Sequence, residues 1–157
     1  MIMFVFLFAL LCTSPSSACA EDYIVLDGFR GLRFRHMQPE VERLRAAGHR
    51  VTYLPWWRWR SAIRSANGPV NVIGYSLGGS RASRLARHID VRQMELVDPV
   101  QIVGVIRLPQ GHARTTVYRA RMPSSIHSSV VLGSHREVLI PTDHGGMPET
   151  FYAYRPW

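Results

Sequence analysis

The chain has 157 residues, of which 46% are hydrophobic and 19% are charged. This length suffices for one compact domain and excludes two, and the composition excludes an intrinsically disordered chain. The net charge of +8 comes from arginine alone, because the sequence contains no lysine. The arginines are scattered over all predicted helices. This favours a solvated basic surface over a nucleic-acid-binding face, and leaves open a peripheral contact with an anionic envelope surface.

Residues 1–20 differ from the rest of the chain. Met1–Leu11 is an apolar run, and a small and polar stretch without charge follows it. The run is too short to span a bilayer, and Ala18–Ala20 has the small residues that signal peptidase accepts. We therefore expect a signal peptide cleaved before Glu21 and a secreted or periplasmic protein; an uncleaved interfacial anchor and a lipid anchor on Cys19 are the alternatives. Both cysteines, Cys12 and Cys19, lie in this segment, so cleavage would leave neither a disulfide nor a thiolate metal site.

Strands and helices alternate beyond this segment. Short, mainly apolar segments predict strands at Tyr23–Leu26, Val51–Leu54, Val70–Ile73 and Met94–Val97. Segments with helical spacing of apolar residues lie between them, at Pro39–Ala47, Trp56–Ala66 and Leu77–His88. Further strands are expected at Thr115–Tyr118, Ser129–Leu132 and Val138–Ile140. The alternation predicts one α/β domain over 21–157, with a mainly parallel sheet and helices on both faces.

A serine flanked by glycines stands between the third strand and the third helix, in the sequence Gly74-Tyr75-Ser76-Leu77-Gly78-Gly79. The GxSxG spacing is typical of a nucleophile elbow, in which a strained serine occupies a sharp strand-to-helix turn and the glycines leave room for it. The following helix directs free N–H groups and its positive dipole end toward the serine. A phosphate-binding loop is disfavoured because Ser80 occupies the position of the required lysine.

The chain resembles the α/β-hydrolase superfamily, particularly its small lipase- and cutinase-like serine esterases. The resemblance rests on the strand leading into Asp27-Gly28-Phe29, the elbow GYSLGG, a strand ending in LVDPV, and the late segment TDHGG. It implies an abbreviated three-layer sandwich. The connection Val100–Arg114 is too short for a large helical cap, so we expect an open site. Asp27 stands where the family often has a histidine.

The resemblance implies hydrolysis of a small-molecule or lipid ester through an acyl-enzyme on Ser76. His144 would take the proton of Ser76, and Asp98 would orient His144. The backbone amides of Leu77 and Phe29 would hold the negative oxygen of the tetrahedral intermediate. A thioesterase or acyltransferase with the same triad is one alternative, and a non-catalytic protein that binds envelope lipid or polysaccharide is another. No cofactor is expected, and no metal, because the histidines lack paired ligand spacing.

Two members of this triad have competitors in the sequence. His144 is preferred because it follows a predicted strand and precedes two glycines, with His135 as the second choice. Asp143 competes with Asp98 for the role of the acid. Neighbouring residues of an extended segment point to opposite sides, which disfavours Asp143 as a partner of His144. Asp98 follows a strand that leads to the edge where parallel sheets collect functional groups.

The tryptophans of the second predicted helix allow two interpretations. Indoles and arginines together are found at membrane interfaces. However, Trp56 and Trp59 share a helical face with Ala62 and Ile63, so we expect both rings to pack inward. Trp57 would then be left to line an acyl pocket or its rim.

Overall fold

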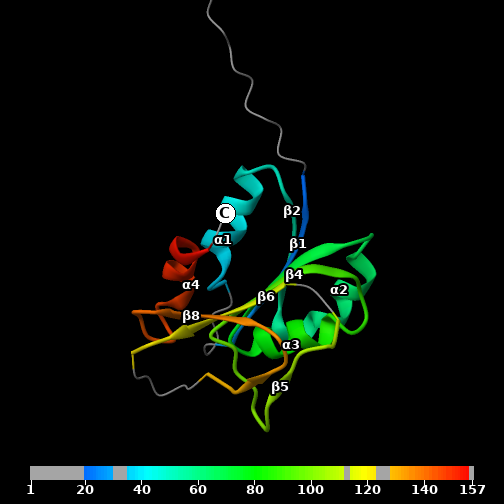
Figure 1. Cartoon of the computed structure of the whole chain (residues 1–157). Coiled ribbons are helices and arrows are strands. Elements are labelled where there is room, and N and C mark those ends of the chain that lie inside the picture. Colours follow the sequence, from blue (N-terminus) through cyan, green and yellow to red (C-terminus); the bar gives the residue numbers. More distant parts are fainter. Residues whose placement is uncertain (1–19, 30–34, 112–113, 123–127, 156–157) are drawn as a thin grey trace, which may run out of the picture.

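A computed structural model describes residues 20–29, 35–111, 114–122 and 128–155 (Figure 1). The expected signal peptide lies outside the described residues except for Ala20. Within the described ranges, no helix has both the length and the apolar character needed to cross a membrane.

Strands and helices alternate along the described chain in the predicted order. The strands are β1 (Asp22–Asp27), β2 (Arg50–Pro55), β3 (Val70–Tyr75), β4 (Val91–Val97), β5 (Ile106–Arg107), β6 (Arg114–Ala120), β7 (Val131–Leu132) and β8 (Arg136–Ile140). The helices are α1 (Gln38–Ala46), η1 (Trp56–Arg58), α2 (Trp59–Ser65), α3 (Leu77–Leu85), α4 (Met147–Thr150) and η2 (Phe151–Tyr154), where η denotes a 3₁₀ helix.

Six strands form one sheet in the order β2-β1-β3-β4-β6-β8, and each neighbouring pair is parallel. The predicted α/β class with a parallel sheet is therefore confirmed. Strands β5 and β7 form a separate parallel pair. Because all six strands run in one direction, their carboxyl ends meet at a single edge, where the connections to the following helices begin.

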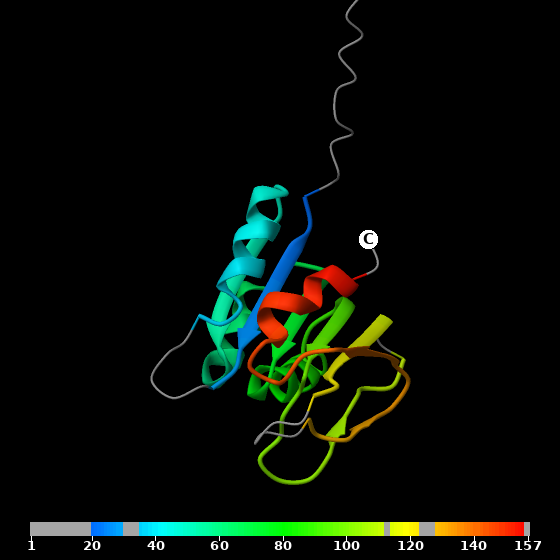
Figure 2. The ribbon, with the colours of Figure 1, turned by 90° about the vertical axis from the view of Figure 1, so that its left-hand side faces the viewer.

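Helices cover both faces of the sheet (Figure 2). Residues of α1, α4 and η2, including Val41, Met147 and Phe151, share one buried cluster with alternate residues of the strands. On the other face, α2 and α3 contribute Trp59 and Leu85 to a second cluster. Side chains of a strand alternate between its faces, so each central strand supplies residues to both clusters.

Three details differ from the sequence prediction. Only Val131–Leu132 of the run 129–132 is a strand, and it pairs with the unpredicted β5 rather than with the main sheet. Helix α3 ends at Leu85, because the amides of Arg87 and His88 bond to carbonyls three residues back in a tight final turn. Residues 147–154, for which the sequence predicted no element, form α4 and η2.

The tryptophans are only partly as predicted. Trp59 is buried, as expected. Trp56 is only half-buried, because it belongs to the 3₁₀ turn η1 that precedes α2 rather than to the amphipathic helix itself. Trp57 is 46% exposed.

Candidate active site

Ser76 occupies a strained turn between β3 and α3. Its φ is 53° and its ψ is −122°, a backbone conformation that residues other than glycine rarely adopt. A β-carbon at Gly74 would stand 2.6 Å from the carbonyl oxygen of Gly78, and one at Gly78 would stand 2.0 Å from the carbonyl oxygen of Leu26. Both glycines of the motif are therefore required for the turn to close, which is the geometry expected of a nucleophile elbow.

His144 lies between Ser76 and Asp98. Its Nε2 is 3.1 Å from Oγ of Ser76, and its Nδ1 is 2.5 Å from Oδ2 of Asp98. A neutral His144 that donates its Nδ1 proton to Asp98 keeps Nε2 as an acceptor for the hydroxyl proton of Ser76. All three residues are buried, so water competes little for these hydrogen bonds.

Asp98 is held in place by β4, which it follows, and by the neighbouring strand β6. It follows β4 with a φ of 41°, and its amide donates to the carbonyl of Tyr118 at 2.7 Å. Its Oδ1 accepts the amide of Ala120 at 3.1 Å. One carboxylate oxygen thus binds the backbone of β6 while the other faces His144, and the orientation of the carboxylate is determined before any ligand binds.

Tyr75, the residue before the serine, contacts the histidine in two ways. Its hydroxyl donates to the backbone carbonyl of His144 at 2.9 Å. Its ring stacks against the imidazole, with 5.2 Å between centroids and an angle of 25° between planes. The two contacts fix both the loop that carries His144 and the plane of its ring. Sequence reasoning missed this role, because the motif leaves that position unspecified.

Asp27 organises the backbone beside Ser76. One carboxylate oxygen accepts the amide of Gly28 at 2.8 Å, and the other accepts the amides of Arg35 and His36 at 2.8 and 2.9 Å. The hydroxyl of Tyr53 also donates to this carboxylate, and burial together with this bond raises the pKa of Tyr53 far above its usual value. One buried side chain therefore joins both ends of the segment that follows β1.

This segment runs past Ser76. A β-carbon at Gly28 would stand 2.6 Å from Cβ of Ser76, so the backbone there approaches as closely as glycine permits. Phe29, whose amide was predicted to bind the oxyanion, follows Gly28 directly in the chain, and its side chain is 50% exposed. The amide of Leu77 borders Ser76 from the first turn of α3.

The structure brings Ser76, Asp98 and His144 together and leaves their competitors elsewhere. Asp143 accepts the amide of Gly146 in a local turn. His135 bonds to the carbonyl of Gly133, on the connection between β7 and β8. Ser76 is 3% exposed and His144 is 4% exposed, so the triad itself is buried beside Gly28 and the ring of Tyr75. The openness of the site, expected from the short connection Val100–Arg114, stays a prediction.

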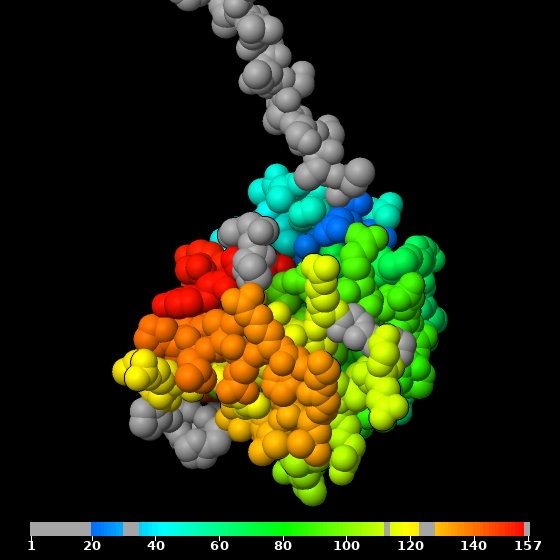
Figure 3. All heavy atoms as spheres, viewed as in Figure 1, coloured from blue at the N-terminus to red at the C-terminus, as the bar shows by residue number. Residues whose placement is uncertain are grey.

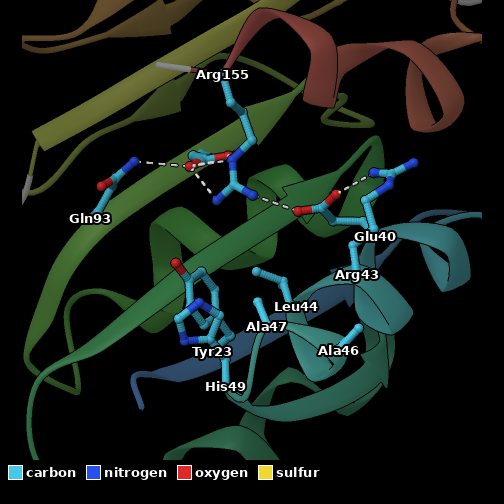
Figure 4. Close-up of a pocket in the computed structure, with 10 residues that line it drawn as sticks. Tyr23, Glu40, Arg43, Leu44, Ala46, Ala47, His49, Gln93 and Arg155 are labelled. Carbon is cyan, nitrogen blue, oxygen red and sulfur yellow. Dashed lines mark hydrogen bonds and ion pairs between the residues drawn. The ribbon is translucent and has the colours of Figure 1, made fainter. Parts of the chain in front are cut away.

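A pocket of about 450 Å³ lies on the face covered by α1, away from the triad (Figure 4). Its polar wall is an ion-pair network in which Arg155 bonds to Glu40 at 2.5 Å and to Glu95 at 2.7 Å. Burial raises the pKa of Glu95, and the adjacent Arg155 offsets part of that rise. The network attaches the C-terminal segment to α1 and β4, and no triad residue lines the pocket.

The described residues contain no group of three or more His, Cys, Asp or Glu side chains arranged to hold a metal ion. The chemistry available at this edge of the sheet is that of a serine hydroxyl with an oriented base beside it. The chain matches no family model, no curated protein and no solved structure.

Proposed function

We propose that the chain is a serine hydrolase of carboxylic esters with an abbreviated α/β-hydrolase fold. One observation carries the proposal: a strained serine at a glycine-flanked elbow, hydrogen-bonded to a histidine that is hydrogen-bonded to a buried aspartate. These three side chains come from separate connections at the carboxyl edge of a parallel sheet. A serine, an imidazole and a carboxylate in this order are the groups that nucleophilic acyl transfer requires.

The reaction begins when Oγ of Ser76 attacks the ester carbonyl and its proton moves to Nε2 of His144. The carbonyl becomes a tetrahedral oxyanion, which the amides of Leu77 and Phe29 stabilise. The carbon–oxygen bond to the alcohol then breaks, and His144 returns the proton to the leaving alcohol. Water then attacks the acyl carbon while His144 takes its proton. The bond to Oγ of Ser76 breaks, His144 returns the proton to Oγ, and the acid is released. Asp98 stabilises the imidazolium in both halves.

The experiment is to react the protein with a fluorophosphonate probe and to measure hydrolysis of a soluble p-nitrophenyl ester. Both signals are expected from the wild type and neither from Ser76→Ala, with a loss of turnover on the order of 10⁴-fold or more. Ser80→Ala is the matched control, because Ser80 lies on α3 and donates to the carbonyl of Leu77. Its activity is expected to remain. Equal labelling of the wild type and Ser76→Ala would reject the proposal.

A further inference from the structure

Four arginines from three elements surround a hollow of about 360 Å³ that no triad residue lines. Arg60 comes from α2, Arg84 and Arg87 come from α3 and the turn that ends it, and Arg107 comes from β5. All four are exposed, and no aspartate or glutamate is among the residues that line the hollow. We call this feature the arginine hollow.

The charge of the arginine hollow is not neutralised within the described chain. The ion pairs between arginines and carboxylates involve Arg43, Arg50, Arg92, Arg119 and Arg155. None of them includes an arginine of the hollow. The neighbouring Arg81 has a lowered pKa, because burial and the positive charges of Arg84 and Arg60 disfavour its charged form.

Helix polarity explains only part of this arrangement. The negative end of the α3 dipole favours cations in its last turn and close to it, which accounts for Arg84 in that turn and for Arg87 just beyond it. It does not account for Arg60 and Arg107, which reach the same hollow from other elements. Arg87 also donates to the carbonyl of Arg107 at 3.1 Å, so two of the guanidinium-bearing segments are held together. A cluster assembled from three elements concentrates positive potential in one concave place.

Exposed aliphatic side chains lie beside the hollow. Gln101 and Val105, which line it, bracket the tip of the β4–β5 loop, where Ile102 is 75% and Val103 is 80% exposed. The loop projects from the lower edge of the molecule (Figures 1 and 3). A small dissolved anion makes no favourable contact with two aliphatic side chains beside its site. A lipid surface offers phosphate to the arginines and hydrocarbon to the loop.

We propose that the arginine hollow binds the phosphate group of an anionic lipid headgroup, with Ile102 and Val103 inserted among the neighbouring lipids. A guanidinium presents a planar pair of donors that matches two phosphate oxygens, which a lysine ammonium does not. Four such groups without a competing carboxylate select a negatively charged lipid surface over a neutral one. Binding weakens as salt screens the exposed charges.

The test is co-sedimentation of the Ser76→Ala protein with vesicles, so that binding is measured apart from hydrolysis. Vesicles of phosphatidylcholine alone are compared with an equal mixture of phosphatidylcholine and phosphatidylglycerol. The hollow variant replaces three arginines by glutamine: Arg84, Arg87 and Arg107. The control variant makes the same change of charge at three exposed arginines outside the hollow: Arg45, Arg114 and Arg136. Circular dichroism and thermal unfolding check that both variants fold.

The Ser76→Ala protein with all its arginines is expected to bind only the mixed vesicles. The hollow variant is expected to bind them at least about tenfold more weakly, because each arginine near an anionic surface contributes a several-fold gain in affinity. The control variant is expected to lose about twofold or less. An equal loss in both variants overturns the proposal, because net charge alone would then explain binding. The proposal is also overturned if the Ser76→Ala protein with all its arginines binds neither kind of vesicle.

A second arm separates a lipid headgroup from a dissolved phosphate. Ile102→Ser/Val103→Ser is expected to weaken vesicle binding several-fold while leaving the weak binding of inorganic pyrophosphate unchanged. Pyrophosphate binding that the hollow variant abolishes, combined with vesicle binding that the loop variant leaves intact, overturns the assignment to a lipid.

Discussion

Replacement of Arg155 by methionine would leave the buried Glu95 without its cation and the buried Glu40 with Arg43 alone. The side chains of Glu40 and Glu95 are 1% and 3% exposed, and that of Arg155 is 6% exposed. Removing one partner of a buried ion pair typically costs 3–5 kcal/mol, so we expect a loss of about that size for Arg155→Met. In a domain of this size the melting temperature should fall by on the order of 10–20 °C.

The loss should also depend on pH in a defined direction. Burial raises the pKa of Glu40 and Glu95, and Arg155, which offsets part of this rise at both carboxyls, is absent in the variant. The folded variant therefore binds protons more readily than the unfolded chain, whose carboxyl pKa is about 4.3. Stability relative to the wild type is lowest near neutral pH and recovers as the pH falls through the raised pKa values.

Urea unfolding followed by circular dichroism measures both effects. Arg50→Met is the matched control, because Arg50 pairs with Asp22 on the surface with a side chain that is 76% exposed. Such a pair contributes little, and its loss should be hard to detect. A loss in Arg155→Met no larger than that in Arg50→Met, or a loss that grows as the pH falls, would refute the reasoning.

Three further outcomes are expected. Asp98→Asn should lower the turnover number by about 10⁴-fold with little change in KM, and Asp143→Asn should do much less. Ester kinetics at alkaline pH decide this, and a larger loss from Asp143→Asn contradicts the assignment. Asp27→Asn should lower the turnover number by on the order of 10²-fold, because it releases the backbone beside the oxyanion, whereas Tyr53→Phe removes one donor to Asp27 and should lower the turnover number less. Equal activity of Asp27→Asn and the wild type contradicts this. Protein recovered from an exporting host should begin at or near Glu21, as N-terminal sequencing will show.

The sheet and the elbow were predictable because their signals are local. Each central strand contains a short, mainly apolar segment that ends at glycine or aspartate, and Ser76 lies between glycines whose spacing is itself the signal. Asp98 and His144 were found through their order in the chain and their positions after strands. The pair β5–β7 was missed because a strand of two residues is too short to show a period.

Contacts between residues far apart in the chain could not be predicted from the sequence. Arg155 bonds to Glu95 and Glu40, which lie 60 and 115 residues earlier, and nothing in the spacing distinguishes this arginine from those on the surface. The role of Asp27 was also missed, although an aspartate before a glycine at the end of a strand is a signal for side-chain bonds to the backbone. Its bonds to Arg35 and His36 required the path of the chain to be known.

The parallel order of the six strands has a consequence for how the chain folds. No two neighbours in the sheet are joined by a hairpin, and β1 pairs with both β2 and β3, so the central contacts join segments far apart in sequence. Closing such loops costs entropy before any contact compensates it, and folding slows as contact order rises. Until β3 pairs with β1 during folding, the edge of β1 that faces β3 presents unpaired amides and carbonyls. Incorrect strand pairing is expected to begin at this edge.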